Sequence, residues 1–390
     1  MRPVLAIAVL MGAGAAVLAG CGASYKLPTE NRLGRGYSTD RSYQMVATWS
    51  GMDGIADILL TQGAGSQLFM LFNHPGVGTA PRGAVYAFAL KARPPVPAPL
   101  PGIEFRTLFV PAALCSSPGR VYVLDQGDTC LARTNPATGS CDTTGGWNGK
   151  VTDLSSYWRV REFGLLGGDT LSTFTDTTMA FVRGVAADDQ GRIYVSGSAI
   201  VLIPDPTDAR ITTRAFLFRV HRYKRVTPGS VPSDINMPGT DRWVRDQSFE
   251  VEEGSGIGTL TDPRGLYWAG SGVSGGPALF AADFGKNWVQ KLSDAASSTG
   301  IFVIDADSSS SLNGPTDVAA DLAGFIYVAD TGNRRVLRYD PYGDYIQRVD
   351  VELDSYGQAL QEAVAVAADD SLVYVGDRVG AKVIRYQRRK

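Results

Sequence analysis

Few residues of this 390-residue chain stand in a pattern that could support catalysis. The only two histidines are His74 and His221, fewer than an imidazole-based zinc site normally uses, and both are predicted to be surface residues and not bases. A Gly/Ser-rich loop around Ser274 matches a nucleophile-elbow pattern and a dinucleotide-binding pattern. The first needs a strand-to-helix turn with a histidine partner, and the second needs a following helix, for which there is no pattern. We therefore predict no catalytic residues.

A second set of polar residues stands where successive apolar strands begin. Aligned on Thr316, with Asp317 one residue further, these positions are Asp53, Pro111, Arg183, Arg264, Thr316 and Ala363. Calcium prefers several oxygen ligands, so a set with two arginines disfavours a Ca²⁺-dependent hydrolase. No metal and no cofactor is expected, and Ca²⁺ is the one ion kept as an alternative. The arginines would suit an anionic group, or they would pair locally with acids such as Asp262 or Asp188.

The elements that position these residues form an internal repeat. Phe325–Asp330 and Val336–Tyr339 recur 47 positions later as Leu372–Asp377 and Val383–Tyr386. A repeat of this length indicates a supersecondary unit that buries its apolar face against its neighbours. Weaker copies upstream bring the number to six, and they begin near residues 54, 119, 191 and 279.

Each copy predicts a four-stranded blade. In the fifth copy the strands are expected at 317–321, 325–329, 336–339 and 345–351, because short apolar runs alternate there with Gly, Asp and Pro. Such units repeated around an axis form a β-propeller. The last copy ends after three strands, so we expect residues 43–49 to supply its fourth strand and close the ring. The predicted fold is all-β, a six-bladed propeller of antiparallel blades.

The fifth copy resembles an NHL repeat. The resemblance is carried by Gly314–Asp321 and Gly324–Val336, although Asp317 stands where the family usually has glycine. It implies a six-bladed propeller over 42–390. It implies no single activity, because NHL-like propellers include binding platforms, lyases and lactonase-type hydrolases. An Asp ends the second strand in four of the copies (Asp125, Asp283, Asp330, Asp377). Its position just before a turn predicts that it accepts hydrogen bonds from the N–H groups of that turn.

The first residues indicate an export signal with a lipid anchor. Arg2 and an apolar run from Val4 to Leu18 precede Leu-Ala-Gly-Cys, which resembles the lipobox of bacterial lipoproteins. This predicts a signal peptide at 1–20, lipidation of Cys21, a tether at 21–41 and a propeller at 42–390. The protein would sit in the cell envelope, held to a membrane by its acyl chains with the propeller outside the cytoplasm. Gly22 in place of Asp favours the outer over the inner membrane.

The remaining composition limits the partners. A net charge of −2 argues against nucleic acid. Among Cys115, Cys130 and Cys141, we expect a Cys130–Cys141 disulfide across a turn with Cys115 buried, and a Cys115–Cys141 pair as the second possibility. The expected function is a monomeric binding platform for a protein, peptide or glycan, with Trp147, Trp158 and Trp243 as aromatic anchors. The alternative is a lyase or lactonase-type enzyme acting in the central channel.

Overall fold

The computed structural model describes most of the residues in Ser42–Lys390. The described residues are 43–61, 66–73, 83–90, 99–108, 110–126, 158–176, 178–204, 212–226, 242–274, 276–294, 300–304, 311–350 and 352–389. Within them, no helix is long and apolar enough to cross a membrane.

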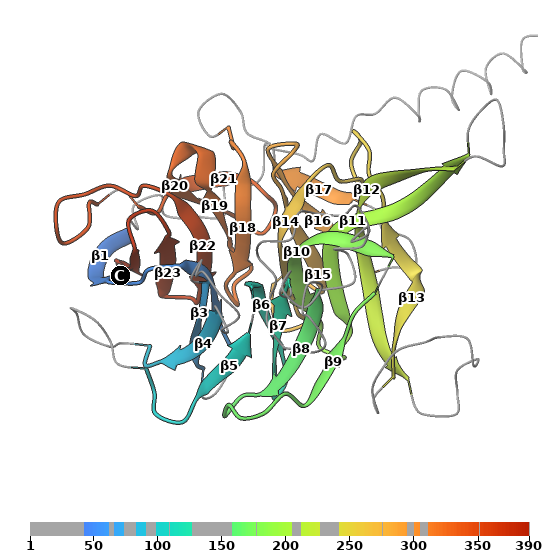
Figure 1. The fold of residues 1–390 in the computed structure, drawn as a ribbon. Coiled ribbons are helices and arrows are strands. Elements are labelled where there is room, and N and C mark those ends of the chain that lie inside the picture. The colour runs from blue at the N-terminus through green and yellow to red at the C-terminus, as the bar shows by residue number, and fades with distance from the viewer. Residues whose placement is uncertain are drawn as a thin grey trace, which may run out of the picture. The chain divides into compact units, whose positions relative to one another are not determined.

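Six four-stranded antiparallel sheets form the blades of a β-propeller (Figure 1). Blades 1 to 3, from the inner to the outer strand, are β2 (Ile55–Leu60), β3 (Leu68–Asn73), β4 (Gly83–Phe88), β5 (Glu104–Leu108); β6 (Pro111–Ser117), β7 (Arg120–Asp125), β8 (Arg159–Gly164), β9 (Ser172–Phe174); and β10 (Met179–Ala187), β11 (Ile193–Pro204), β12 (Thr212–Val226), β13 (Arg242–Val251). Blades 4 to 6 are β14 (Pro263–Ala269), β15 (Ala278–Asp283), β16 (Trp288–Leu292), β17 (Gly300–Ile304); β18 (Pro315–Ala320), β19 (Ile326–Asp330), β20 (Arg335–Tyr339), β21 (Tyr345–Arg348); and β22 (Ala363–Ala368), β23 (Leu372–Asp377), β24 (Lys382–Arg388), β1 (Tyr43–Ser50). The sequence-based prediction of six blades is confirmed.

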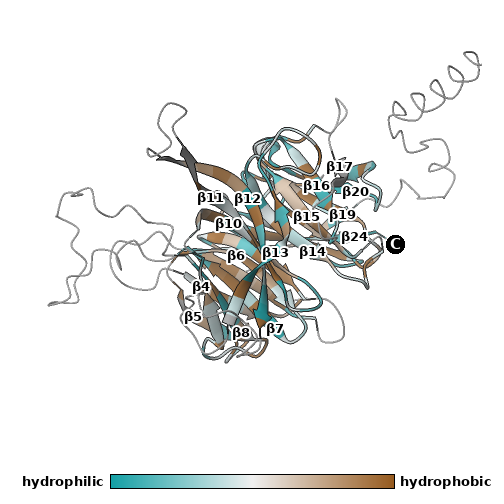
Figure 2. Ribbon diagram, turned by 90° about the vertical axis from the view of Figure 1, so that its right-hand side faces the viewer, coloured by the Kyte–Doolittle hydropathy of each residue, from teal (hydrophilic) through white to brown (hydrophobic). Residues whose placement is uncertain are grey.

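The apolar cores lie between neighbouring blades. Val85 and Phe105 of blade 1, for example, share a buried cluster with Val121, Val123 and Phe163 of blade 2. Hydrophobic residues accordingly recur along the strands of the blades (Figure 2). Because one blade cannot bury both of its faces alone, the ring is stable only when each sheet has a neighbour on either side.

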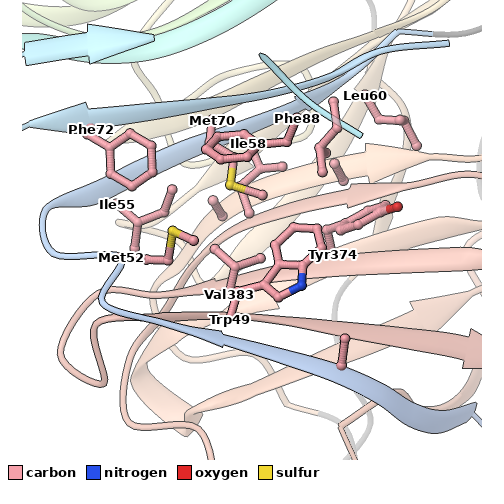
Figure 3. Packing of buried hydrophobic residues seen from close by; sticks show 14 of the residues in the cluster. Trp49, Met52, Ile55, Ile58, Leu60, Met70, Phe72, Phe88, Tyr374 and Val383 are labelled. Atoms are coloured by element: carbon pink, nitrogen blue, oxygen red, sulfur yellow. The ribbon is translucent and has the colours of Figure 1, made fainter. Parts of the chain in front are cut away.

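The N-terminal strand closes the ring, as predicted. β1 pairs antiparallel with β24 from Tyr43↔Arg388 to Ser50↔Lys382, as the fourth strand of blade 6. The Trp49 side chain is fully buried and its ring lies 6.0 Å from that of Tyr374, in a core that also includes Phe88 of blade 1 (Figure 3). At the other end of β1, the Tyr43 hydroxyl lies 2.8 Å from that of Tyr327 in blade 5. One strand therefore ties blade 6 to both of its neighbours.

A β-bulge interrupts the inner strand of every blade near the start of that strand. The residue just after each interruption is Asp57, Ala113, Gly184, Gly265, Asp317 or Ala365. A Cβ atom built on Gly184 would lie 2.2 Å from the Arg264 carbonyl oxygen, and one on Gly265 would lie 2.6 Å from that of Thr316. Glycine is required at these two positions because adjacent inner strands approach closely there. Small or acidic residues thus form a ring around the axis.

The repeated aspartates are structural, but their hydrogen-bond donors differ from those predicted. Asp125, Asp283, Asp330 and Asp377 are fully buried. They accept backbone N–H groups chiefly from the segment that enters the inner strand of the same blade, as Asp330 does from Asn313 (2.7 Å) and Asp377 from Glu362 (2.9 Å). The following turn contributes less, for example the Gly380 N–H to Asp377. Each carboxylate therefore fixes where its inner strand begins.

Asp330→Ala is expected to lower the free energy of unfolding by about 3 kcal/mol. The substitution removes the acceptor for Asn313 N–H (2.7 Å), Asn333 Nδ2 (2.8 Å) and Arg335 Nε (2.7 Å), so three donors lose a partner at once. Urea unfolding followed by circular dichroism measures the change. Asp370→Ala, at an exposed aspartate in the β22–β23 turn, is the matched control and should stay within about 0.5 kcal/mol of the wild type. Equal losses in both variants would show that Asp330 does not position the strand.

Candidate functional site

The inner strands of all six blades surround a cavity of about 760 Å³ on the propeller axis. Its wall includes one residue of the same inner-strand register from each blade: Ile58, Leu114, Val185, Leu266, Val318 and Val366. A concave site with apolar walls and a few convergent polar groups is the usual form of a ligand site. We call its end at the start of the inner strands the channel mouth.

Two of the predicted arginines meet at the channel mouth and share one carboxylate. Arg183 Nε lies 3.2 Å from Asp262 Oδ1, and Arg264 Nη2 lies 3.0 Å from Asp262 Oδ2. The Arg264 guanidinium also stacks on Phe284, with Cζ 3.3 Å from the ring centroid. The local pairing with Asp262 that the sequence left open is therefore present. Because two cations share one anion, the pairing leaves a net positive charge.

The opposite side of the channel mouth carries further polar groups. Arg378 donates two hydrogen bonds to Glu362, from Nε to Oε2 at 3.0 Å and from Nη2 to Oε1 at 2.5 Å. Next to this pair, the Thr316 hydroxyl lies 2.6 Å from that of Thr331 and donates to the Val364 carbonyl at 3.2 Å. These contacts hold the polar side chains in place before any ligand arrives.

The ring of residues equivalent to Thr316 differs from the one predicted. In four blades, the first residue of the inner strand pairs with the aspartate that ends the second strand; these residues are Pro111, Pro263, Pro315 and Ala363. Thr316 follows Pro315, so the equivalent residue in each of the other three blades is the one that follows Pro111, Pro263 or Ala363. The ring is Ala56, Ala112, Arg183, Arg264, Thr316 and Val364. Asp53 instead lies exposed in the turn before β2, outside the cavity wall. The alignment was wrong by one residue in blades 2 and 6 and by three in blade 1, where Phe72 replaces the aspartate that marks the register.

Two carboxyl groups line the cavity below the channel mouth. The Asp317 carboxyl group accepts two backbone hydrogen bonds, one from the N–H of Val318, the next residue, and one from the N–H of Val366 in blade 6, both at 2.8 Å. Asp57 does the same with Ile58 (2.7 Å) and Leu114 of blade 2 (2.6 Å). Each carboxyl group therefore links two adjacent inner strands.

Burial strongly affects the ionisation of this carboxyl pair. Desolvation by the surrounding protein raises the pKa of Asp57 to about 7, although its backbone hydrogen bonds act in the opposite direction. Desolvation, together with the negative charge of Asp57, raises the pKa of Asp317 well above its usual range. Asp317 was among the residues predicted from the sequence, and Asp57 was not. Aligning Ile55-Ala56-Asp57 with Pro315-Thr316-Asp317 would have found it.

Cys115 is buried against the same cavity and is a free thiol. Burial, and then the charge of Asp57, raises the pKa of this thiol, so the unreactive protonated form is favoured. Its predicted burial is confirmed. Cys130 and Cys141 lie outside the described residues.

Other sequence-based predictions about side chains were wrong. His221 is 1% exposed and not at the surface, and burial, followed by the charge of Arg245, lowers its pKa to about 4. Trp158 and Trp243 are core residues in a cluster between blades 2 and 3, so they are not exposed anchors. His74 and Trp147 lie outside the described residues. Within the described part of the chain, no group of three or more His, Cys, Asp or Glu side chains is arranged to hold a metal ion.

Comparisons with known proteins found distant structural similarity. No family model and no curated protein matches the sequence. A solved structure described as a candidate gluconolactonase is 12% identical with a TM-score of 0.45, over 90% of this chain and 93% of that one. A protein of unknown function from Bacteroides caccae is 10% identical (TM-score 0.42; 80% and 82% covered). Raptor from Chaetomium thermophilum is 9% identical (TM-score 0.47), over 90% of this chain and 29% of that one. The similarity concerns the fold alone.

Proposed function

We propose that this protein is a cell-envelope lipoprotein whose propeller is a binding platform, with the channel mouth as its ligand site. The observation that carries the proposal is the arrangement of Arg183, Asp262 and Arg264, which is organised in advance and carries excess positive charge above a cavity of about 760 Å³. Fixed guanidinium groups bind anionic partners at little entropic cost because few side-chain rotations are lost.

The location of this platform follows from the lipobox. Lipidation of Cys21 would hold the protein on a membrane, and residues 21–41 would act as the tether. A ligand-binding domain on a tether can reach partners in the envelope without leaving the membrane surface. A peptide, protein or glycan partner with an acidic group fits this placement.

A second candidate function is an enzyme of the lyase or lactonase type, and the carboxyl pair in the channel favours it. Asp57, with a pKa of about 7, is suited to exchange a proton at neutral pH. Asp317 would then supply a protonated carboxyl group beside it. Metal analysis of the purified protein tests this candidate, since a stoichiometric Ca²⁺ would support the enzyme.

The platform is tested by calorimetric titration of wild-type protein and of the Arg183→Ala/Arg264→Ala double variant. The panel contains acidic peptides, uronic-acid oligosaccharides, phosphorylated sugars and neutral oligosaccharides. We expect at least one acidic ligand to bind, and the double variant to bind it at least tenfold more weakly. Arg389→Ala, at an exposed arginine that pairs with Glu352 away from the channel, is the control and should bind normally. Unaltered affinity in the double variant would remove the channel mouth from the site.

A further inference from the structure

Among the residues that the structure describes, a two-stranded extension beyond the four-stranded sheet is found in blade 3 alone. β10 pairs with β11 only as far as Met179↔Ala199, and β13 pairs with β12 only as far as Val251↔Val220. Residues 200–204 and 212–219 therefore continue beyond the sheet, on the side where β10 begins. We call this segment the arm, and Figure 1 shows β11 and β12 extending past the other strands. Because β10 begins at the channel mouth, the arm extends on the same side of the propeller as that mouth.

Two exposed phenylalanines meet where the arm leaves the blade. Phe181 and Phe216 are 57% and 50% exposed, and their ring centroids lie 5.4 Å apart at an interplanar angle of 65°. Phe181 has a φ of +48°, a left-handed conformation that is strained for a bulky residue. The bulge between Ala180 and Gly184 holds it there. Strained backbone clusters at ligand-binding sites, and this residue combines such a backbone with an exposed aromatic side chain.

This aromatic pair lies close to the charged groups of the channel mouth. Phe181 and Arg183 are two residues apart, so their Cα atoms are within about 7 Å of each other. Arg183 Nε lies 3.2 Å from Asp262, and the Arg183 side chain is 40% exposed, so it is open to a further partner. Guanidinium donors and an apolar surface are therefore presented side by side.

The net charge of the side chains at the channel mouth indicates which kind of anion the site would bind. The cavity wall at the channel mouth carries Arg183, Arg264 and Arg378, and their partners are the carboxylates of Asp262 and Glu362. Three positive charges against two negative charges leave an excess of one, which a monoanion neutralises. A phosphate monoester carries about two negative charges at neutral pH, and it would face the carboxyl pair below. A carboxylate matches the site better.

The ring pair indicates the group attached to that anion. The two rings are in T-shaped contact and each is about half exposed, so together they offer a compact apolar surface, which suits an apolar group. We propose that the channel mouth and the Phe181–Phe216 pair together bind an aliphatic carboxylate, that is, a carboxylate a few bonds away from an apolar group. The proposal deepens the proposed function and rests on it.

The sources of such a group are a peptide chain end and a free aliphatic acid, and calorimetry with defined probes separates them. The probes are octanoate, the acid Ac-Ala-Ala-Leu, its C-terminal amide, and the acid Ac-Ala-Ala-Ser. Binding of the leucine acid identifies a chain end, and binding of octanoate alone identifies a free acid. We expect the amide to bind at least tenfold more weakly than the acid, because it lacks the charge. The serine acid should bind about tenfold more weakly because it lacks the apolar group.

Two variants assign these effects to the two halves of the site. Arg183→Ala should remove the preference for acid over amide, and Phe216→Ala should remove the preference for leucine over serine. Leu171→Ala, at a 53% exposed leucine of blade 2, is the matched control for Phe216→Ala and should keep both preferences. Equal binding of acid and amide, or binding of none of the probes, would overturn the proposal. Binding of a phosphorylated sugar or neutral glycan that still depends on the two arginines would overturn it too, but would leave the platform intact.

Discussion

Deleting residues 43–49 is expected to abolish folding of the propeller, so that the protein aggregates or loses its cooperative melting transition. Without β1, the outer edge of β24 has no partner, and the core around Trp49 is opened to water. The deletion also removes the Tyr43–Tyr327 contact between blades 5 and 6. Thermal melting by circular dichroism and size-exclusion chromatography measure the result. A truncated protein with the wild-type melting temperature would show that the ring closes without this strand.

Two point substitutions separate the effect of packing from the loss of the whole strand. Trp49→Ala should lower the free energy of unfolding by about 3–5 kcal/mol, because the side chain is fully buried. Trp49→Phe should cost less, because the indole N–H has no hydrogen-bond partner in this core and none is lost. Deletion of residues 30–36, seven residues of the predicted tether, is the length-matched control for the deletion of 43–49 and should leave the melting temperature unchanged. Similar losses for Phe and Ala would mean that the shape of the indole is needed.

Asp57→Asn is expected to change the way stability depends on pH. The pKa of Asp57 in the folded protein is raised to about 7, from an ordinary value near 3.8. The unfolded chain therefore ionises first, and the stabilising contribution of this group is complete below about pH 4 and lost as pH rises through 7. The difference of about 3 pK units corresponds to at most about 4 kcal/mol.

The effect of Asp57→Asn on the free energy of unfolding should therefore change sign between low and high pH. Asparagine keeps only one oxygen, so either the Ile58 or the Leu114 N–H loses its acceptor, at a cost of about 1 kcal/mol at every pH. At pH 4 the variant should be less stable than the wild type, and at pH 8 it should be more stable, because the wild type then carries a buried charge. Urea unfolding from pH 4 to 8 follows this crossover. Asp53→Asn, at an exposed turn residue, is the control. A constant difference between Asp57→Asn and wild type would place the pKa of Asp57 outside this range.

Much of the fold was predictable because the sequence pattern that specifies each blade lies within a short segment of the chain. Alternating apolar residues and turn residues predict strands one at a time, and a constant spacing predicts that the units are equivalent. The incomplete last copy then required a strand from elsewhere, and 43–49 was the apolar segment left over. The expected strand 325–329 is observed as Ile326–Asp330, and 345–351 as Tyr345–Arg348. Differences of this size at strand ends are normal.

The candidate site was only partly predictable. Arg183, Arg264, Thr316 and Asp317 all line the cavity, as their place at the start of inner strands indicated. Asp53 does not, because blade 1 lacks the aspartate that marks the register in the clearer copies. His221 was misjudged because its strand reads as a charged, exposed segment. In the folded protein the His221 side chain is buried, and its Nε2 lies 3.5 Å from Oε1 of Glu250 on the neighbouring strand.

The sequence by itself determined the number of blades, their four-stranded form and the strand that closes the ring, because these depend on patterns within short segments. Only the tertiary structure decided which side chains meet. The bulge in each inner strand sets which residue faces the axis, and the closure of the ring places Asp57 of blade 1 and Asp317 of blade 5 in one cavity. The approach of blades 3 and 4 joins Arg183 and Arg264 through Asp262. Such contacts join residues dozens to hundreds of positions apart, so no local pattern encodes their distances or the pKa shifts that burial causes.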